Sequence, residues 1–301
     1  MTDSAAIVRS AFRQGLVVPA FNIPYLPMVE PVIRAVRDED AFAFVAVARI
    51  EWMKLAAGGP TPVAAEFRKH DDPHHVRLHL DHVPVVDEDD AQVEWRAILR
   101  EGIAAGYRSL MIDASRLDLE GNIAATREAV AIAHEAGIPC EAELGAVLGH
   151  EDGPLPPYEE LFESGMGFTD VEQARRFVAE TGCDWLSVAI GSVHGAISGA
   201  AKHKDKVEAR LDLGHLQRLT DATDIPLVLH GGSGVKQEAV LAAIRLGIAK
   251  VNVATEIRRP YEAAMRAAGD IGAAQDAVYK RTVWVLRDYF GVSGQRSALL
   301  P

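Results

Sequence analysis

Short strand-like apolar runs alternate with segments of helical periodicity along the whole chain. The alternation predicts βα units whose strands pair in parallel. Amphipathic segments such as 28–37, 90–106, 121–136, 170–181 and 237–246 separate the runs. The eight strand-like runs are 16–22, 41–48, 76–81, 109–113, 139–143, 185–190, 226–230 and 249–253.

Eight such strands can close into a barrel or form a large doubly wound sheet. The spacing between the runs is fairly even, and no G-x-G-x-x-G follows the first run. Most runs also end in a polar residue, and α/β barrels assemble their active sites from the carboxyl ends of their strands. The predicted fold class is therefore α/β, with residues 1–301 forming a single (β/α)8 TIM barrel and a mobile active-site loop at about 145–168.

Charge and cysteine content limit the classes of partner. The net charge of −12 argues against nucleic acid, whose phosphates most of the surface would repel. No segment approaches the ~20 apolar residues of a membrane span or contains the apolar core of a signal peptide. The two cysteines, Cys140 and Cys183, are too few for a disulfide framework. These features predict a cytoplasmic protein with two reduced core thiols.

Three histidines stand at or just beyond the carboxyl ends of predicted strands. They are His82 in LHLDH, His194 in GSVHG and His230 in VLHGGSG. Any one of them could be a hydrogen-bonded core or loop residue, but three imidazoles with an open fourth position are a recurrent ligand set for catalytic zinc. The nearby carboxylates could orient the rings or offer a second metal position; they are Asp113, Glu141 and Glu143.

Six segments together resemble one enzyme family. PAFNIPYLPMVEPVI, LHLDH, IPCEAELG, DWLSVAIGSVHG, PLVLHGGSG and KVNVATEIR resemble, in the same order, class II fructose-bisphosphate/ketose-bisphosphate aldolases. The resemblance runs from about residue 17 to residue 258. It implies a zinc-dependent barrel that is a homodimer, homotetramer or other oligomer. Another divalent metal in place of Zn²⁺, or a monovalent cation, stays open.

The resemblance also implies roles for individual residues. His82, His194 and His230 would be the metal ligands, and Asp113 and Glu143 would hold a displaced or second metal. Asp81 would exchange a proton with the hydroxyl formed from the aldehyde oxygen. Because neighbouring residues of a regular strand point to opposite faces, Asp81 and His82 can share a site only if the strand ends or bulges there.

A loop and a glycine-rich turn complete the expected site. Glu151, in GHEDG, would handle the carbon-bound proton of the substrate, although a solvated acidic turn would look the same in sequence. GGSG, followed by a helix expected near residue 236, would cradle phosphate at a helix N-terminus. The residues expected to contact phosphate or substrate hydroxyls are Asn22, Gly195, Gly231, Ser233, Asn252 and Thr255.

Three departures from the family pattern bear on the substrate. The lysine that usually follows HG is missing, so either Lys202 or Lys204 replaces it from further along the chain, or the substrate carries no phosphate there. Arg49 stands where the family has a serine-containing turn, as a new anion anchor or as a surface arginine. LDHVPVVDEDD replaces the small, Gly/Ser-rich turn that normally follows the aspartate–histidine pair, and NVATE lacks one acidic side chain that the fructose-bisphosphate enzymes use. Fructose 1,6-bisphosphate is therefore not the expected substrate.

The leading hypothesis is reversible aldol cleavage of a ketose phosphate into a ketone similar to dihydroxyacetone phosphate and an aldehyde. A lyase that acts on an unphosphorylated or acidic sugar derivative is the alternative. A barrel that binds metal or sugar without catalysis is the third interpretation. Because the carbonyl is activated by metal, no Schiff-base lysine is required; Lys250 nevertheless lies inside the eighth predicted strand.

Overall fold

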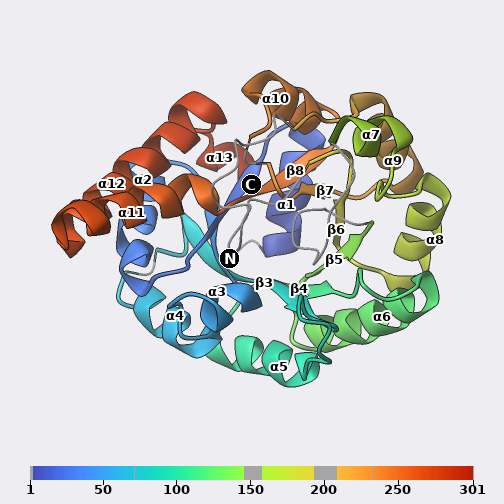
Figure 1. Cartoon of the computed structure of the whole chain (residues 1–301), viewed down its shortest axis with the longest axis horizontal. Helices are drawn as coiled ribbons and strands as arrows, with labels where there is room; N and C mark the ends of the chain where they lie inside the picture. Colours follow the sequence, from blue (N-terminus) through green and yellow to red (C-terminus); the bar gives the residue numbers. More distant parts are fainter. Residues whose placement is uncertain (1–2, 71, 146–157, 193–208, 233, 301) are drawn as a thin grey trace.

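Eight parallel strands form a closed barrel in the computed structural model, which describes residues 3–70, 72–145, 158–192, 209–232 and 234–300. Each strand pairs with the next in sequence, and β8 closes the ring on β1 (Figure 1). The single (β/α)8 barrel predicted from the sequence is confirmed. The strands are β1 Val18–Asn22, β2 Ala43–Ala48, β3 Val76–Pro84, β4 Leu110–Asp113, β5 Cys140–Leu144, β6 Trp185–Val188, β7 Leu227–Leu229 and β8 Ile248–Val253.

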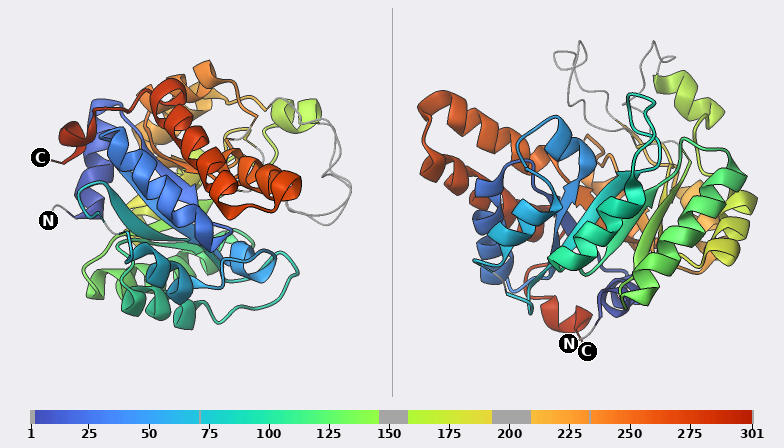
Figure 2. Two further views of the ribbon diagram at one scale, coloured as in Figure 1. Left: turned by 90° about the vertical axis from the view of Figure 1, so that its left-hand side faces the viewer. Right: turned by 90° about the horizontal axis from the view of Figure 1, so that it is seen from below.

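Helices surround the barrel, and the α11–α12 pair projects from its side (Figure 2). No helix among the described residues is both long and apolar enough to cross a bilayer. The helices are α1 Ser4–Gln14, η1 Leu26–Met28, α2 Val29–Asp38, α3 Arg49–Met53, α4 Pro60–Phe67, α5 Trp95–Ala105, α6 Leu119–Glu135, α7 Tyr158–Ser164, α8 Val171–Thr181, α9 Leu213–Thr223, α10 Gln237–Arg245, α11 Thr255–Ala268, α12 Ile271–Trp284, η3 Val285–Tyr289 and α13 Arg296–Leu299.

Helix α1 closes the amino-terminal end of the barrel. Its apolar face, made of Ile7, Val8 and Ala11, packs with Phe44 and Trp185 from the barrel interior in one buried cluster. Both ends of the described chain lie at this end of the molecule (Figure 2). A packed floor leaves the opposite end, where the strands finish, for chemistry.

The predicted strands agree with the structure to within a few residues at each end, but some predicted helix starts were wrong. The segment expected to be helical from residue 90 begins its helix at Trp95. Residues before it form a turn in which the Asp87 carboxylate accepts hydrogen bonds from the Asp89 and Ala91 amides. The N-caps of α6 and α8 are Asp118 and Asp170, although Ser115 and Thr169 lie just before them in the sequence.

Polar side chains reach the barrel interior at alternate strand positions. Because alternate residues of a strand share a face, β5 directs Glu141 and Glu143 inward, and β8 directs Lys250 and Asn252 inward. Glu141 and Lys250 are fully buried. These pairs bring charged groups from distant parts of the sequence into one compartment under the carboxyl edge.

Candidate active site

A β-bulge in β3 brings two consecutive residues into the site. The pairing with β4 shifts from Leu80↔Leu110 to Val83↔Ile112, so β3 has one more residue than β4 across this interval. His82 lies in the bulge with φ of 35°, a region that few non-glycine residues occupy. The irregularity that the sequence requires for Asp81 and His82 to act together is therefore present.

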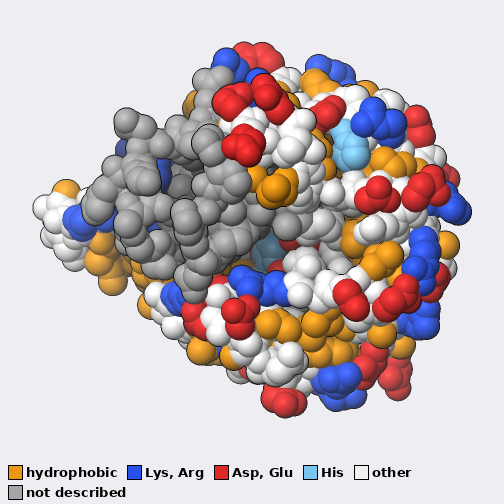
Figure 3. All heavy atoms as spheres, turned by 45° about the vertical axis from the view of Figure 1, so that its right-hand side comes forward, with side chains coloured by type: hydrophobic (Ala, Val, Ile, Leu, Met, Phe, Trp, Pro, Cys, Tyr) orange, Lys and Arg blue, Asp and Glu red, His pale blue; other side chains and the backbone are white. Residues whose placement is uncertain are grey.

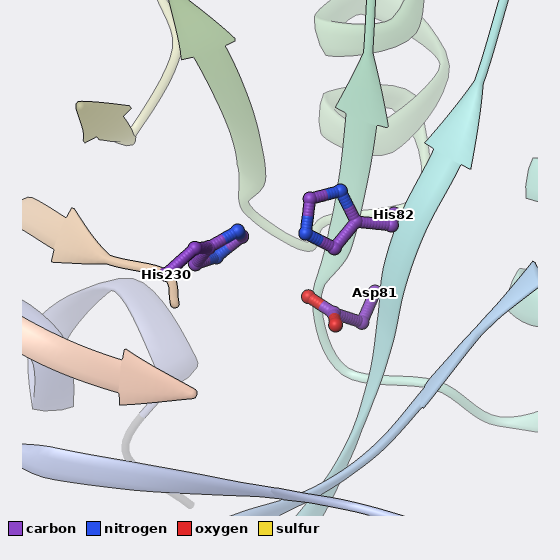
Figure 4. Close-up of side chains that lie close together, drawn as sticks. All are labelled: Asp81, His82 and His230. Carbon is purple, nitrogen blue, oxygen red and sulfur yellow. The ribbon is translucent and has the colours of Figure 1, made fainter. Parts of the chain in front are cut away.

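Two imidazoles and one carboxylate converge beside this bulge. The ring centroids of His82 and His230 are 4.5 Å apart, and one potential ligand atom each from Asp81, His82 and His230 lies within 4.8 Å of the others (Figure 4). His230 follows β7, on the far side of the barrel from β3. The third predicted ligand, His194, lies outside the described residues.

The carboxylates Asp113 and Glu143 border the same space. Asp113 Oδ2 is 3.2 Å from His82 Nδ1, and Ser115 donates hydrogen bonds to Asp113 Oδ1 from its hydroxyl and its amide. Glu143 Oε2 lies 3.9 Å from His82 Nδ1 and 3.4 Å from His230 Nδ1. His82, Asp113 and Glu143 form a second group whose ligand atoms fit around one ion.

Asp81 is buried and held by two side-chain amides. Asn22 Nδ2 donates to Asp81 Oδ2 at 2.8 Å, and Asn252 Nδ2 lies 2.9 Å from both carboxylate oxygens. Burial alone would raise the pKa of this carboxyl, but the charges of His82 and Lys250 and a hydrogen bond from His79 hold it well below its usual value. Asp81 is therefore a buried, ionised carboxylate beside the two imidazoles.

The electrostatic field of the site favours a cation. Burial alone would lower the pKa of His82, but the negative charge of Asp81, the hydrogen bond to Asp113 and the charge of Glu143 raise it to about 10. The same carboxylates that favour an imidazolium would favour a divalent metal ion. Imidazole nitrogens mixed with carboxylate oxygens suit Zn²⁺ and related metals, so these residues fit a metal of that class.

Lys250 supplies a fixed positive charge below the site, a feature that the sequence analysis left without a role. His79, Asp81 and Glu141 form a third group of potential ligands, but the Lys250 ammonium lies 2.8 Å from Glu141 Oε2 and 3.9 Å from Asp81 Oδ1. The Lys250 ammonium thus already supplies the positive charge that the carboxylates of this third group favour. Its only sequence signal is the spacing of Lys250 and Asn252 two residues apart on one strand.

Glu51 was also missed by the sequence analysis. Its Oε2 accepts a hydrogen bond from the Ala48 amide at 2.8 Å, and Asn22 Nδ2 lies 3.4 Å away. Asn22 therefore lies between the carboxyl of Glu51 and that of Asp81. Burial raises the pKa of Glu51 to about 8, which keeps this carboxyl neutral near Asp81. The only sequence signal is an acidic residue three positions after the end of β2.

The proton on Glu51 links stability to pH. Because its pKa rises from 4.5 to about 8 on folding, the folded chain holds more protons than the unfolded chain between these values. The contribution of Glu51 to stability is fully present below pH 4.5. It decreases by roughly 1.4 kcal/mol per pH unit as the pH rises through this window.

The Glu51→Gln variant keeps an acceptor for the Ala48 amide and has no proton to lose. We expect the Tm of the metal-free variant to fall less between about pH 5 and about pH 8 than that of the wild type. Equal falls would contradict this expectation.

A small cavity lies next to the glycine-rich turn. It has a volume of about 90 Å³, and its lining includes Gly232, Gly234, Asn252, Thr255 and Arg281. Thr255 is the first residue of α11, so the positive end of that helix faces this region. Asn252 lines the cavity and also donates a hydrogen bond to Asp81, so its side chain connects the cavity with the Asp81 carboxylate.

The remaining predicted residues lie as follows. Gly231 follows β7 with a φ of 66°. Arg49 Nη1 lies 3.0 Å from Asp87 Oδ2, and its side chain is only 16% exposed, so it is not a surface arginine. Within the loop predicted at 145–168, the structure describes residue 145 and residues 158–168. The second of these parts begins with helix α7. The predicted residues outside the described ranges are Glu151, Gly195, Lys202, Lys204 and Ser233.

The carboxyl end of the barrel is hollowed at its surface. Figure 3 shows this hollow beside the grey atoms, with a histidine side chain visible at its base and both acidic and basic side chains near the rim. At least one histidine side chain is therefore visible from outside at this end of the barrel.

Comparison with known proteins assigns the family. The model of the class-II fructose-bisphosphate aldolase family matches residues 2–292. The chain belongs to this family. As a class II aldolase it is an aldehyde-lyase, and the family acts on small sugar phosphates with the help of a divalent metal.

Solved structures agree with this assignment. The YdjI aldolase from Escherichia coli K12 is similar, with 28% identity and a TM-score of 0.75 over 98% of this chain and 99% of that chain. A protein assigned as a fructose-1,6-bisphosphate aldolase from Coccidioides immitis has 25% identity and a TM-score of 0.76 over 98% of each chain. A fructose-bisphosphate aldolase from Campylobacter jejuni, at 17% identity and a TM-score of 0.69 over 96% of each chain, shares the fold.

Proposed function

We propose that this class II aldolase uses Zn²⁺ to cleave a ketose phosphate reversibly into a ketone similar to dihydroxyacetone phosphate and an aldehyde. The observation that carries the proposal is the convergence of Asp81, His82 and His230 within 4.8 Å at the carboxyl edge of an aldolase-family barrel. His82 and His230, with His194 as third ligand, would hold the ion. When bound, it supplies Lewis-acid polarisation of the substrate carbonyl.

The protein's own residues would then move the protons. In the cleavage direction Asp81 would take the proton from the hydroxyl that becomes the aldehyde oxygen, and in the reverse direction it would return it. Its two amide partners, Asn22 and Asn252, orient its oxygens for this role. Glu151, by its resemblance to the family's glutamate, would carry the proton of the donor carbon.

A phosphate group would be bound by the turn after β7 and the start of α11. The cavity of about 90 Å³ lined by Gly232, Gly234 and Thr255 supports this placement, because backbone amides and a helix N-terminus favour anions. Gly231, Ser233 and Gly195 would contribute from the neighbouring turns. We further propose that the protein acts in the cytoplasm as a homodimer or homotetramer.

A chelator and borohydride distinguish the metal mechanism from a Schiff-base mechanism. We expect a strong chelator to abolish cleavage and added Zn²⁺ to restore it. Borohydride in the presence of substrate should leave activity intact, because the Lys250 ammonium is fully buried and hydrogen bonded to Glu141 and Asn252. Inactivation by borohydride with resistance to the chelator would overturn the proposal. Running the assay on phosphorylated, unphosphorylated and acidic ketoses identifies the substrate class.

A further inference from the structure

His82 and His230 direct different ring nitrogens toward the carboxylates that support them. His82 Nδ1 lies 3.2 Å from Asp113, whereas in His230 it is Nε2 that lies 3.1 Å from Glu141 Oε1. A histidine that binds a metal through one nitrogen commonly donates the N–H of the other to a carboxylate. The supporting carboxylate therefore decides which nitrogen remains for the metal.

The Glu141 carboxylate is surrounded by hydrogen-bond donors. Lys250 Nζ lies 3.1 Å from Oε1 and 2.8 Å from Oε2, and Trp185 Nε1 donates to Oε2. Lys250 also donates to Asn252 Oδ1 at 2.7 Å. Glu141 and Lys250 are fully buried. An ionised carboxylate in this setting can only accept hydrogen bonds, so the His230 nitrogen that faces it must carry a proton.

We propose that the Glu141–Lys250 ion pair is the positioning pair for His230. Glu141 keeps the proton on His230 Nε2, which leaves Nδ1 as the coordinating nitrogen, and Lys250 holds Glu141 in place. His230 Nδ1 lies 3.4 Å from Oε2 of Glu143, a member of the second group of potential ligands. This inference rests on the metal site of the proposed function and specifies the coordination of that site.

Substitution of both partners avoids leaving one charge buried alone. Removing a single partner of a buried ion pair is strongly destabilising, whereas replacing both by apolar residues is often tolerated. The Glu141→Leu/Lys250→Met variant removes the acceptor for His230, and Glu141→Gln/Lys250→Met keeps a neutral one. As a matched control, Glu66→Gln/Lys69→Met removes an ion pair near the surface.

Metal affinity and NMR test the proposal without an activity assay. Competition with a chromogenic chelator should show Zn²⁺ affinity reduced about 10–100-fold in Glu141→Leu/Lys250→Met, less in the glutamine variant and not in the control. In the wild-type protein labelled with ¹⁵N-histidine and loaded with ¹¹³Cd²⁺, the ¹¹³Cd–¹⁵N coupling of His230 should appear at Nδ1. Because this NMR measurement uses the wild type, it tests the proposal even if the variants do not fold.

The outcomes separate this inference from the proposed function. Coupling at His230 Nε2, or wild-type Zn²⁺ affinity in the folded Glu141→Leu/Lys250→Met variant, would overturn the positioning role and leave the metal site standing. Failure of the wild type to bind either Zn²⁺ or Cd²⁺ would overturn the metal site itself and this inference with it.

Discussion

The His82→Asn variant is expected to lose its bound metal and to cleave substrate roughly 10³-fold more slowly. Lewis-acid catalysis contributes several kcal/mol, and each 1.4 kcal/mol corresponds to about a tenfold change in rate. Asparagine suits the position because it tolerates positive φ better than most residues, and His82 has a φ of 35°. The fold should therefore survive while the imidazole is lost. Elemental analysis of the purified variant and its steady-state rate measure the two effects.

His134→Ala is the matched control for this experiment. The His134 side chain is 47% exposed and pairs with Asp184, outside the three groups of potential ligands among the described residues. The His134→Ala variant should keep the metal content and the cleavage rate of the wild type. One equivalent of tightly bound metal in folded His82→Asn would show that this imidazole is not a ligand.

The Asp81→Asn variant is expected to keep its metal but lose about 10²–10⁴-fold in kcat, the usual contribution of a general acid or base. The amide is nearly the same size as the carboxylate but cannot take the hydroxyl proton. KM should change much less, because Asp81 acts on the reacting oxygen. Cleavage kinetics and metal content together test the assignment.

Proton exchange sharpens the test of Asp81. If Asp81 serves only the aldehyde oxygen, the variant should still exchange the donor-carbon proton of the ketone with deuterated solvent. Glu151→Gln should lose that exchange. Loss of exchange in Asp81→Asn, with the metal still bound, would assign Asp81 to the carbon proton instead. Absence of exchange in the wild type would favour a barrel that binds metal without catalysis.

The sequence was sufficient to predict the barrel and the proximity of Asp81, His82 and His230. Strand alternation and polar strand ends placed these three residues together, because parallel strands of a barrel bring their carboxyl ends to one edge. The exact helix starts were harder to predict. Asp118 and Asp170 compete as caps with nearby Ser115 and Thr169, and local chemistry alone does not rank them.

Only part of the buried support of the site could be predicted: Glu141 was named as a carboxylate that could orient a histidine ring, but neither Lys250 nor Glu51 was given a role. Lys250 and Glu141 are distant in sequence, and only the closure of β8 onto the rest of the ring makes them neighbours. Glu51 looks like any surface glutamate until burial by the barrel changes its proton affinity. These effects depend on which side chains surround a group, and a single sequence does not specify that environment.

The bulge in β3 limits how this chemistry could be transplanted. Grafting Asp81 and His82 onto a regular strand of another barrel would leave one of them facing the outer helices, because side chains alternate. A designer would have to copy the extra residue and the left-handed backbone at His82 along with the side chains. The unit to be moved is thus a piece of distorted main chain.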